Sequence, residues 1–482
     1  MNMSEANSNM QNQYYEQELA EEDVKHTKTL KTRLKTLWKI IKSYQIRMEI
    51  VILAISICDT ARIVITPTLM DEKVRRVYEV PDVVDNSTDS INKFFNQKIV
   101  LWDQNYNYVN LPLTIAATIF FGSFSDQNGR KIPMIFGLIG MLMGNMVYIS
   151  VWWYKTDFAL QWLFLAAVLN GITGGFRMVT SSVNAYLSDQ FEIKTVLSIR
   201  MLITYTILNV GDLIGSQLTK LITHHFDELW AAFFMQIVNI LILVYVIFVV
   251  KDINRPYHEY DLVKIAKDGV YSLWSSIKLV LRKRKGNFRL LLWLTFVCVL
   301  INRSAFNEEK DLIGVYTKLG PFHWTTEDFA VYKSYRPFVQ ILGLLIGLFV
   351  FKNWLKLKDT TVIILATLSM GLDSLLIGLA QSSTLIYISL VAGILHALTN
   401  PLIFTLYSCL VSPSETGRVF AVDSVIQNVS TLIKVVVLQN LYVATINWYQ
   451  GFIWLLLSSM ALISMSIMTV IHVLYNRDVD GR

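Results

Sequence analysis

Long apolar stretches alternate with short polar links along nearly the whole chain. A helix that crosses the hydrocarbon core of a bilayer needs about 20 mainly apolar residues. Twelve stretches meet this requirement, at residues 48–69, 106–125, 132–153, 157–187, 198–221, 230–250, 289–310, 331–351, 360–380, 384–410, 418–441 and 448–475. The first, fourth and eleventh also contain charged residues. The pattern therefore predicts an all-α membrane protein built from twelve helices.

Composition supports a lipid surrounding and argues against several functional classes. Charged residues make up 17% of the chain, whereas soluble domains are about 25% charged. The three cysteines, Cys58, Cys298 and Cys409, fall inside predicted helices and offer neither a disulfide framework nor metal-ligand spacing. The sequence contains no recognisable nucleotide-binding loop or catalytic triad. We therefore expect no cofactor, no metal, no nucleic-acid partner and no enzymatic activity, with membrane lipid as the surroundings and a monomer as the default.

Basic residues indicate the orientation. Lys and Arg near helix ends favour the cytoplasmic side, and they gather before the first span, between the sixth and seventh spans and after the eighth. These segments fall on one side if the spans alternate, so we predict that both termini are cytoplasmic. The predicted parts are an N-terminal tail (1–47), a six-helix half (48–250), a basic linker (251–288), a second six-helix half (289–475) and a C-terminal tail (476–482).

The first outer loop, at about residues 70–105, contains an N-glycosylation sequon. Asn86 is followed by Ser87 and Thr88, and the loop lies on the predicted side where glycosylation occurs. Asn86 is therefore the candidate glycosylation site. Chance sequons are common, so use of this sequon and its chance occurrence are both open.

The link between the second and third spans concentrates turn-forming and charged residues. Its pattern is G-x-x-x-D-x-x-G-R-K, formed by Gly122, Asp126, Gly129, Arg130 and Lys131. This pattern matches a signature of the major facilitator superfamily. We expect Gly122 to allow close helix approach, Gly129 to permit the turn, and Asp126 to pair with Arg130 or a helix terminus. Such a group is a candidate conformational latch; the alternative is a topology anchor with a turn.

The chain also resembles solute carrier family 46, the group of the proton-coupled folate transporter, over residues 110–460. The residues that carry this resemblance are Gly174-Gly175, Ala185 to Asp189, Tyr316, Pro321 to Trp324, Pro401 to Ile403, Glu415-x-Gly417, Tyr442-x-Ala444-Thr445 and Gly451-Phe452. The resemblance implies a twelve-helix bundle of two six-helix pseudo-repeats. It also implies transport of a small organic solute, with an organic anion and proton symport as the expected case.

Four positions depart from the pattern of the folate transporter. Its fifth-helix glutamate, tied to proton coupling, corresponds to Tyr205, and its seventh-helix histidine to Phe306. Its tenth-helix arginine corresponds to Phe404 and its fourth-helix aspartate to Gly175. The resemblance therefore supports the family, whereas it does not support folate as the substrate. If the chain couples transport to protons, other residues must carry them.

Ionisable residues inside the predicted spans are the candidates for a substrate or proton path, because they are costly in lipid and rarely face it. The candidates are Asp59, Arg62, Arg177, Asp212, Arg303, His396 and Lys434. Asp59 and Arg62 are three residues apart and can pair on one helix face, either as part of the path or only to neutralise each other. Asp373 lies on the ninth span, and we expect a structural role for it.

The candidates suggest different tasks. We predict that Asp212 carries protons, because desolvation favours a protonated carboxyl and its helix face is polar. His396 is the alternative, since histidine titrates near neutral pH. Lys434 and Arg303 would favour a negatively charged substrate.

The predicted function is alternating-access transport of a small organic solute, an organic anion, with protons as a candidate partner. A proton-independent facilitator and a non-transporting receptor on the same fold are the alternatives. The plasma membrane is the default location, and an endolysosomal membrane is the second choice.

Overall fold

The computed structural model describes residues 47–81, 87–190, 194–252, 267–271, 274, 278, 282, 287–411 and 416–480. The predicted glycosylation site Asn86 lies outside these residues. The described regular structure is helical, without a β-strand in the described ranges. The described residues from Met48 onward form one compact unit.

The first six predicted spans are helices. In chain order they are α2 (Met48–Val77), α3 (Thr88–Asn128), α4 (Lys131–Trp152), η1 (Leu160–Trp162) with α5 (Leu163–Thr173) and α6 (Gly175–Gln190), α7 (Lys194–His225) and α8 (Glu228–Phe248). The fourth span is broken because Gly174 adopts the left-handed conformation, at φ 72°, and ends α5. Glycine occupies this conformation without the steric cost of a Cβ atom.

The second six predicted spans are also helical, and three of them change helix type along their length. They are α10 (Phe288–Tyr316), α11 (Thr326–Ile346) with the π-helical η2 (Gly347–Trp354), α12 (Asp359–Gly378), α13 (Ser383–Ala392) with η3 (His396–Leu398) and α14 (Thr399–Leu410), α15 (Thr416–Ile433) with the π-helical η4 (Lys434–Leu438) and α16 (Gln439–Thr445), and α17 (Phe452–Asp480). Short π-helical stretches inside α-helices are frequent at functional sites.

Eight of the described helical segments are long and apolar enough to cross a membrane. The other four, α2, α3, α7 and the α15–α16 segment, are present as helices but are more polar. These four contact the opposite half of the bundle: α2, α3 and α7 meet α10, α11 or the α15–α16 segment. Their polar residues therefore face protein more than lipid, which explains why a hydropathy criterion ranks them lower.

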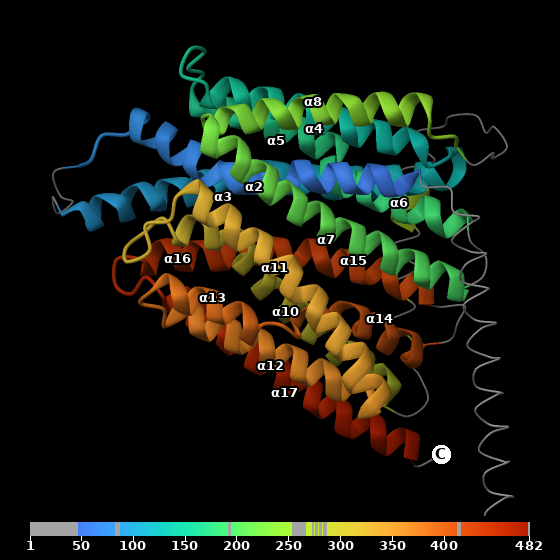
Figure 1. Cartoon of the computed structure of the whole chain (residues 1–482). Coiled ribbons are helices and arrows are strands. Elements are labelled where there is room, and N and C mark those ends of the chain that lie inside the picture. The colour runs from blue at the N-terminus through green and yellow to red at the C-terminus, as the bar shows by residue number, and fades with distance from the viewer. Residues whose placement is uncertain are drawn as a thin grey trace, which may run out of the picture. The chain divides into compact units, whose positions relative to one another are not determined.

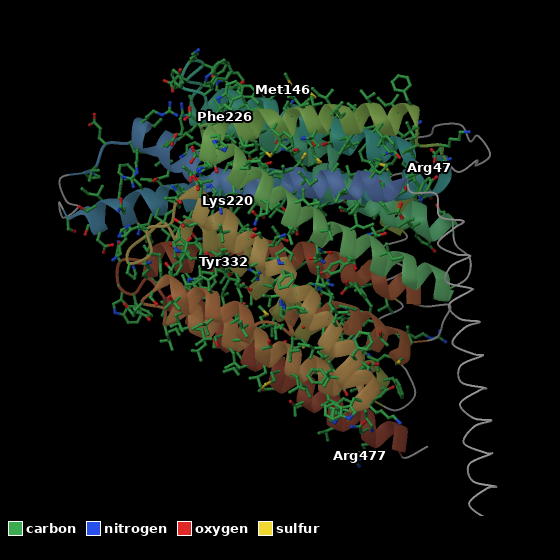
Figure 2. All side chains as sticks on the ribbon, viewed as in Figure 1. Arg47, Met146, Lys220, Phe226, Tyr332 and Arg477 are labelled. Atoms are coloured by element: carbon green, nitrogen blue, oxygen red, sulfur yellow. The ribbon has the colours of Figure 1, made fainter. Side chains whose placement is uncertain are left out.

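The helices pack mainly within two groups (Figure 1). In the first group α2 packs on α7 and α8, and α4 packs on α5, α6 and α8; in the second, α17 packs on α10 and α12. Large apolar side chains such as Phe226 and Met146 point outward and are 60% and 55% exposed, as expected of a lipid-facing surface, whereas Tyr332 is fully buried (Figure 2). The boundaries predicted at residues 250 and 289 stay predictions.

Close packing of α7 on α2 depends on two glycines. A Cβ atom on Gly211 would lie 2.7 Å from Ser56, and one on Gly215 would lie 2.7 Å from the carbonyl oxygen of Ile57. The spacing is Gly-x-x-x-Gly, which lets two membrane helices approach closely. The same approach brings Asp212, next to Gly211, against the polar face of α2.

Candidate functional site

The candidate latch surrounds Arg130, at the junction of α3 and α4. Its guanidinium donates to Asp189 on α6 (Nε–Oδ2 2.8 Å) and to Ser125 (Nη1–Oγ 2.5 Å). Asp252, after α8, accepts the backbone N–H of Arg130 at 3.1 Å. Gly129 has φ 99°, and a Cβ atom there would lie 2.3 Å from the Asp252 carboxylate. Three distant segments therefore meet at the start of α4, and glycine is required at the turn.

The structure differs from the predicted latch at Gly122 and adds a charged partner for Arg130. The close helix approach expected at Gly122 is wrong for this conformation, because a Cβ atom there would meet nothing within 4 Å. Among the described side chains, Asp189 is a charged partner of Arg130; the side chain of Asp126 lies outside the described part. Lys131 donates from Nζ to the carbonyl oxygen of Ile247 at 2.7 Å. The role of the group as a latch stays a prediction.

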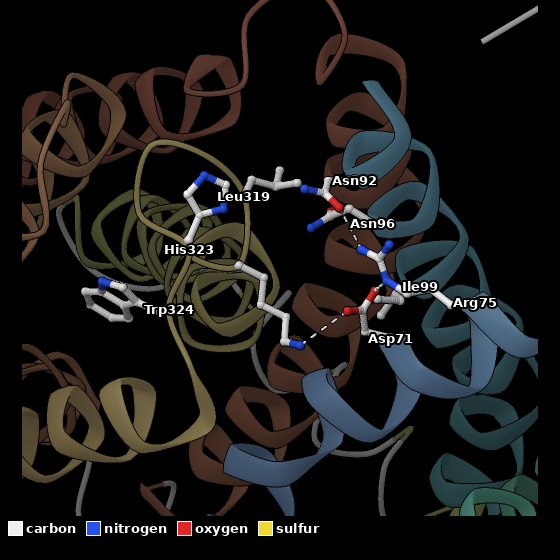
Figure 3. Close-up of a pocket in the computed structure, with 9 residues that line it drawn as sticks. Asp71, Arg75, Asn92, Asn96, Ile99, Leu319, His323 and Trp324 are labelled. Carbon is white, nitrogen blue, oxygen red and sulfur yellow. Dashed lines mark hydrogen bonds and ion pairs between the residues drawn. The ribbon is translucent and has the colours of Figure 1, made fainter. Parts of the chain in front are cut away.

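The two halves meet at the opposite end of the bundle, where α2 ends and α3 begins. A cavity of about 120 Å³ lies there between α2, α3 and the α10–α11 link (Figure 3). Asp71 accepts from Arg75 at 3.0 Å and pairs with Lys318 of the second half at 3.5 Å. Burial lowers the pKa of the Lys318 ammonium, and Asp71 opposes that effect. Arg75 also donates to Asn92 at 2.8 Å.

Further bonds join α3 to the second half below this cavity. Asn96 donates to the carbonyl oxygen of Val315 at 2.7 Å and accepts from the Tyr442 hydroxyl at 2.8 Å. Gln97 donates to the carbonyl oxygen of Val443 at 2.9 Å. Asn96 and Tyr442 are 3% and 0% exposed. The Tyr442–Asn96 bond is buried and the other two are partly buried, and together they hold α3 against α10 and α16.

A third set joins α7 and α2 to α11. Gln217 donates to the Ser334 hydroxyl at 2.7 Å. The hydroxyls of Thr68 and Thr326 lie 2.7 Å apart, and Thr326 also donates to Glu228 at 2.8 Å. We call the inter-half contacts of α2, α3 and α7 with α10, α11 and α16 described in these three paragraphs the loop-end clamp. All of them lie between the middle of the bundle and the end at which α2 finishes.

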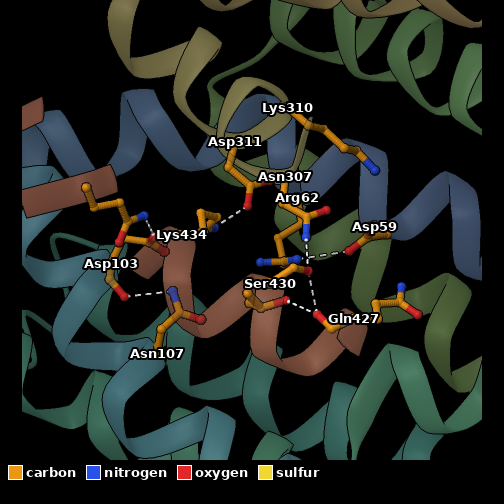
Figure 4. Close-up of polar contacts among 12 residues, drawn as sticks. Asp59, Arg62, Asp103, Asn107, Asn307, Lys310, Asp311, Gln427, Ser430 and Lys434 are labelled. Atoms are coloured by element: carbon orange, nitrogen blue, oxygen red, sulfur yellow. Dashed lines mark hydrogen bonds and ion pairs between the residues drawn. The ribbon is translucent and has the colours of Figure 1, made fainter. Parts of the chain in front are cut away.

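Below the loop-end clamp, polar and charged side chains from both halves gather near the middle of the bundle (Figure 4). We call this group the central cluster; its members are Asp59, Arg62, Asp103, Asn107, Asn307, Lys310, Asp311, Gln427, Ser430 and Lys434. Lys434 donates to Asp311 at 2.5 Å, with side-chain exposures of 4% and 46%. Asn307 donates to Ser430 at 3.3 Å. Four helical segments, α2, α3, α10 and the α15–α16 segment, supply the cluster.

Three of the sequence-predicted path residues are in the central cluster: Asp59, Arg62 and Lys434. The predicted pairing of Asp59 with Arg62 is confirmed, at 2.9 Å. Arg177 on α6 also reaches across to α15, donating to Asn428 at 3.2 Å and to Thr431 at 3.3 Å, and it remains exposed. The resulting region contains accessible cations held between the two halves.

Asp212 lies next to the cluster, in the first half. Its Oδ1 atom accepts from Ser56 at 2.6 Å and from Thr60 at 2.7 Å. Both donors are on α2, which contacts α7 through the glycines described above. The carboxylate is therefore solvated by hydroxyls and joins the two helices.

Two predicted path residues are placed elsewhere. Arg303 lies near the middle of α10, which extends from Phe288 to Tyr316. It donates to Asp423 at 2.8 Å, which also accepts from Tyr407 at 3.1 Å. The ring of His396 packs on Phe306 with centroids 4.5 Å apart. The structure thus ties Arg303 into the second half and places His396 against an aromatic ring.

The sequence analysis missed a run of charged residues on α10. Glu308, Glu309, Lys310 and Asp311 were placed at or beyond the end of the seventh span, because the run lowers local hydropathy. In the structure they lie within α10, with Glu308 and Glu309 at 0% exposure. The apolar residues that resume after Asp311, Leu-Ile-Gly-Val-Tyr, were the signal that the helix continues.

Lys333 and Arg336 on α11 were also missed. Arg336 pairs with Glu309, and Lys333 donates to the carbonyl oxygen of Lys310 at 3.2 Å. Both cations are less than 10% exposed. Within the described residues no group of His, Cys, Asp or Glu has the arrangement of a metal site. The site is therefore suited to binding a charged solute by ionic and hydrogen-bonding contacts.

Comparison with known proteins agrees with this architecture. The sequence pattern of the Major Facilitator Superfamily matches residues 110–434. The lysosomal proton-coupled steroid conjugate and bile acid symporter SLC46A3 of Gallus gallus is 21% identical over 390 residues, covering 80% of this chain and 81% of that protein. The probable peptidoglycan muropeptide transporter SLC46 of Drosophila melanogaster is 24% identical, covering 69% of this chain and 65% of that protein.

Solved structures show the same fold at low sequence identity. A POT family transporter in complex with 5-aminolevulinic acid has a TM-score of 0.62 at 14% identity, covering 88% of this chain and 95% of its own. The human organic anion transporter MFSD10 has a TM-score of 0.60 at 14% identity, covering 87% of this chain and 97% of that chain. The pattern match over more than half of the sequence, together with this fold, places the chain in the Major Facilitator Superfamily, with relatives in solute carrier family 46.

Proposed function

We propose that this multi-pass membrane protein transports a small organic anion by alternating access. The observation that carries the proposal is the central cluster, a charged region between two helical groups that the loop-end clamp joins toward one end. Helices α8 and α17 diverge toward the other end (Figure 1). Closing one end while a polar site lies between the halves is the arrangement that alternating access requires.

An anion fits the region of the central cluster and Arg177 because several cations there lack a carboxylate partner or remain accessible. Among the described residues, the partners of the Arg177 side chain are neutral groups of α15, and Arg177 is exposed. Arg62 pairs with Asp59 but keeps 39% of its side chain accessible. The side-chain ammonium group of Lys310 has no hydrogen bond or ion pair to any described residue. A carboxylate, sulfate or phosphate group of a substrate would supply acceptors to these donors.

The test is uptake by proteoliposomes that contain the purified full-length chain. A pH step across the membrane should be combined with a panel of folates, steroid conjugates, bile acids and peptidoglycan fragments. The relatives suggest the panel, since their names include steroid conjugates, bile acids and muropeptides. Saturable uptake of an anion supports the proposal. Saturable binding without flux would instead support the receptor alternative.

The orientation is part of the proposal, with both termini in the cytoplasm and residues 70–105 outside. Epitope tags at the two ends should resist protease added to intact cells or sealed organelles. A tag between α2 and α3 should be cleaved from the outer or luminal side. Cleavage of the terminal tags in sealed membranes would reverse the topology, and the loop-end clamp would then face the cytoplasm.

Proton coupling is proposed through Asp212, with His396 as the alternative carrier. Asp212→Asn should flatten the dependence of uptake on pH, because that helix would lose its titrating carboxyl group. His396→Gln should change the profile less. The measurement is uptake against pH for both variants beside the parent protein. If both variants keep the profile of the parent, neither residue is required for coupling.

The membrane is proposed to be the plasma membrane, with an endolysosomal membrane as the alternative. The relative SLC46A3 is named as lysosomal. Cell fractionation of the tagged chain distinguishes the two locations.

Glycosylation of the outer loop at Asn86 is also part of the proposal. A shift in electrophoretic mobility on enzymatic deglycosylation that is lost in Asn86→Gln would support it.

A further inference from the structure

Glu308, on α10, has surroundings that differ from those of the two other carboxylates near it on the helix, Glu309 and Asp311. Its side chain is 0% exposed, and neither Oε1 nor Oε2 has a hydrogen-bond partner. Glu309, which follows it, pairs with Arg336. Asp311, one turn later, binds Lys434 at 2.5 Å. Glu308 is therefore a buried carboxyl group without a donor, in a helix whose other carboxylates are paired.

The charged groups around Glu308 are engaged elsewhere. The groups that face it electrostatically are Lys434 of η4, Asp311 of its own helix, Asp103 of α3 and Tyr442 of α16. Lys434 donates to Asp311, and the Tyr442 hydroxyl donates to Asn96 of the clamp. Gln439 donates to Asp103 at 2.7 Å. The donors nearby are thus committed to other acceptors, while two nearby carboxylates repel a negative charge on Glu308.

Glu308 lies directly below the loop-end clamp. Val315, whose carbonyl oxygen accepts from Asn96, follows Glu308 by seven residues, or about 10 Å along α10. Lys318, which binds Asp71, lies two residues beyond the end of α10. Asn96 and Tyr442 form a buried bond between Glu308 and the loop end. Water from that end therefore reaches Glu308 only when the clamp opens.

An ionised carboxylate that is buried without a partner is strongly unfavourable, so such a group is buried in its neutral form. The closed clamp is therefore compatible with a protonated Glu308 and disfavours an ionised one. We propose that Glu308 is a proton-binding site that permits closure of the loop-end clamp only after it has taken up a proton. This inference rests on the proposed alternating-access function, and it adds a site in the second half to the one predicted at Asp212.

The steps balance in protons. With the clamp open, Glu308 takes one proton from water at the loop end, forming a neutral carboxylic acid, and the clamp closes over it. When the central cluster opens at the other end, the acid gives its proton to water there. The resulting carboxylate competes with Asp311 for Lys434. Lys434 begins the π-helical η4 segment, and π-helical segments are a recurrent feature of functional sites.

The test uses a reporter cysteine in the cavity at the clamp and needs no substrate. Ile99 lines the loop-end cavity and is 5% exposed. In the full chain carrying Cys409→Ser to remove the exposed native thiol, Ile99→Cys is labelled by a membrane-impermeant maleimide at several pH values. Dividing each variant's labelling rate by that of the parent cancels the pH dependence of the thiol itself.

Glu308→Gln mimics the neutral acid and should keep the clamp closed at every pH. Its labelling rate relative to the parent should therefore fall as pH rises, approaching about tenfold per pH unit, as expected when closure takes up one proton. Glu308→Asp still titrates, so its labelling rate should depend on pH as that of the parent does. This variant distinguishes loss of the titrating group from a structural effect of the substitution. Asp373→Asn is the matched control, because Asp373 is 5% exposed with an unpartnered Oδ1 atom but lies on α12, away from the clamp.

The outcomes separate this inference from the proposed function. A constant labelling ratio of Glu308→Gln to parent across the pH range would overturn it, and so would an equal effect of Asp373→Asn. A ratio that falls with pH supports it even if no anion in the uptake panel is transported, a result that would count only against the proposed function.

Discussion

Asp311→Asn is expected to reduce uptake by about 30- to 150-fold. The substitution leaves the Lys434 ammonium, 4% exposed, without its carboxylate at the junction of the two halves. Breaking a fully buried ion pair costs about 3–5 kcal/mol. Because Asp311 is 46% exposed, solvent reduces the cost to about 2–3 kcal/mol, and each 1.36 kcal/mol corresponds to tenfold in rate.

The control for this experiment is an exposed pair on α3. Asp89 bonds Lys93 at 2.7 Å with 55% of its side chain exposed, so Asp89→Asn should change uptake less than about threefold, as for a surface pair worth under 1 kcal/mol. The charge reversal Asp311→Lys with Lys434→Asp should recover part of the loss. Normal initial rates for Asp311→Asn at normal protein level would show that the pair has no part in transport.

The second large effect is expected at the latch. Arg130→Ala should lower turnover by at least about tenfold, since the loss of charge-assisted bonds costs about 1.5–3 kcal/mol each, and Arg130 is 8% exposed with bonds to Asp189 and Ser125. Asp126→Asn should impair turnover as well. Because the bonds link helix ends and not the apolar spans, surface delivery and helix content should change little.

Two further variants identify the cause. Arg130→Lys keeps the charge but not the geometry that binds Asp189 and Ser125 together, so it should recover turnover only in part. Arg289→Ala removes a positive charge at the start of α10 and should leave turnover unchanged. If Arg130→Ala and Asp126→Asn both transport at the parent rate, the group is a topology anchor only.

The charged residues Glu308 to Asp311 on α10 show what a hydropathy pattern cannot predict. The mean hydropathy of a stretch that includes Glu308 to Asp311 is low, so the predicted span ends there. A hydropathy criterion treats every face of a helix as if it met lipid. In the structure these charges face other helices: Glu309 meets Arg336 and Asp311 meets Lys434. Arg336 is 27 residues from Glu309 in the sequence, and Lys434 is 123 residues from Asp311. The local sequence around α10 therefore does not predict these pairs.

The sequence by itself determined the helical class, the positions of the helices and the superfamily, because lipid provides no hydrogen-bond partners and therefore requires long apolar helices. Local spacing also determined the Asp59–Arg62 pair, three residues apart on one helix. Only the tertiary structure decided that Arg130 binds Asp189 and that Glu308 is left without a donor. The physical reason is that partners and burial depend on which helices come together, and this is decided by packing between segments far apart in the chain.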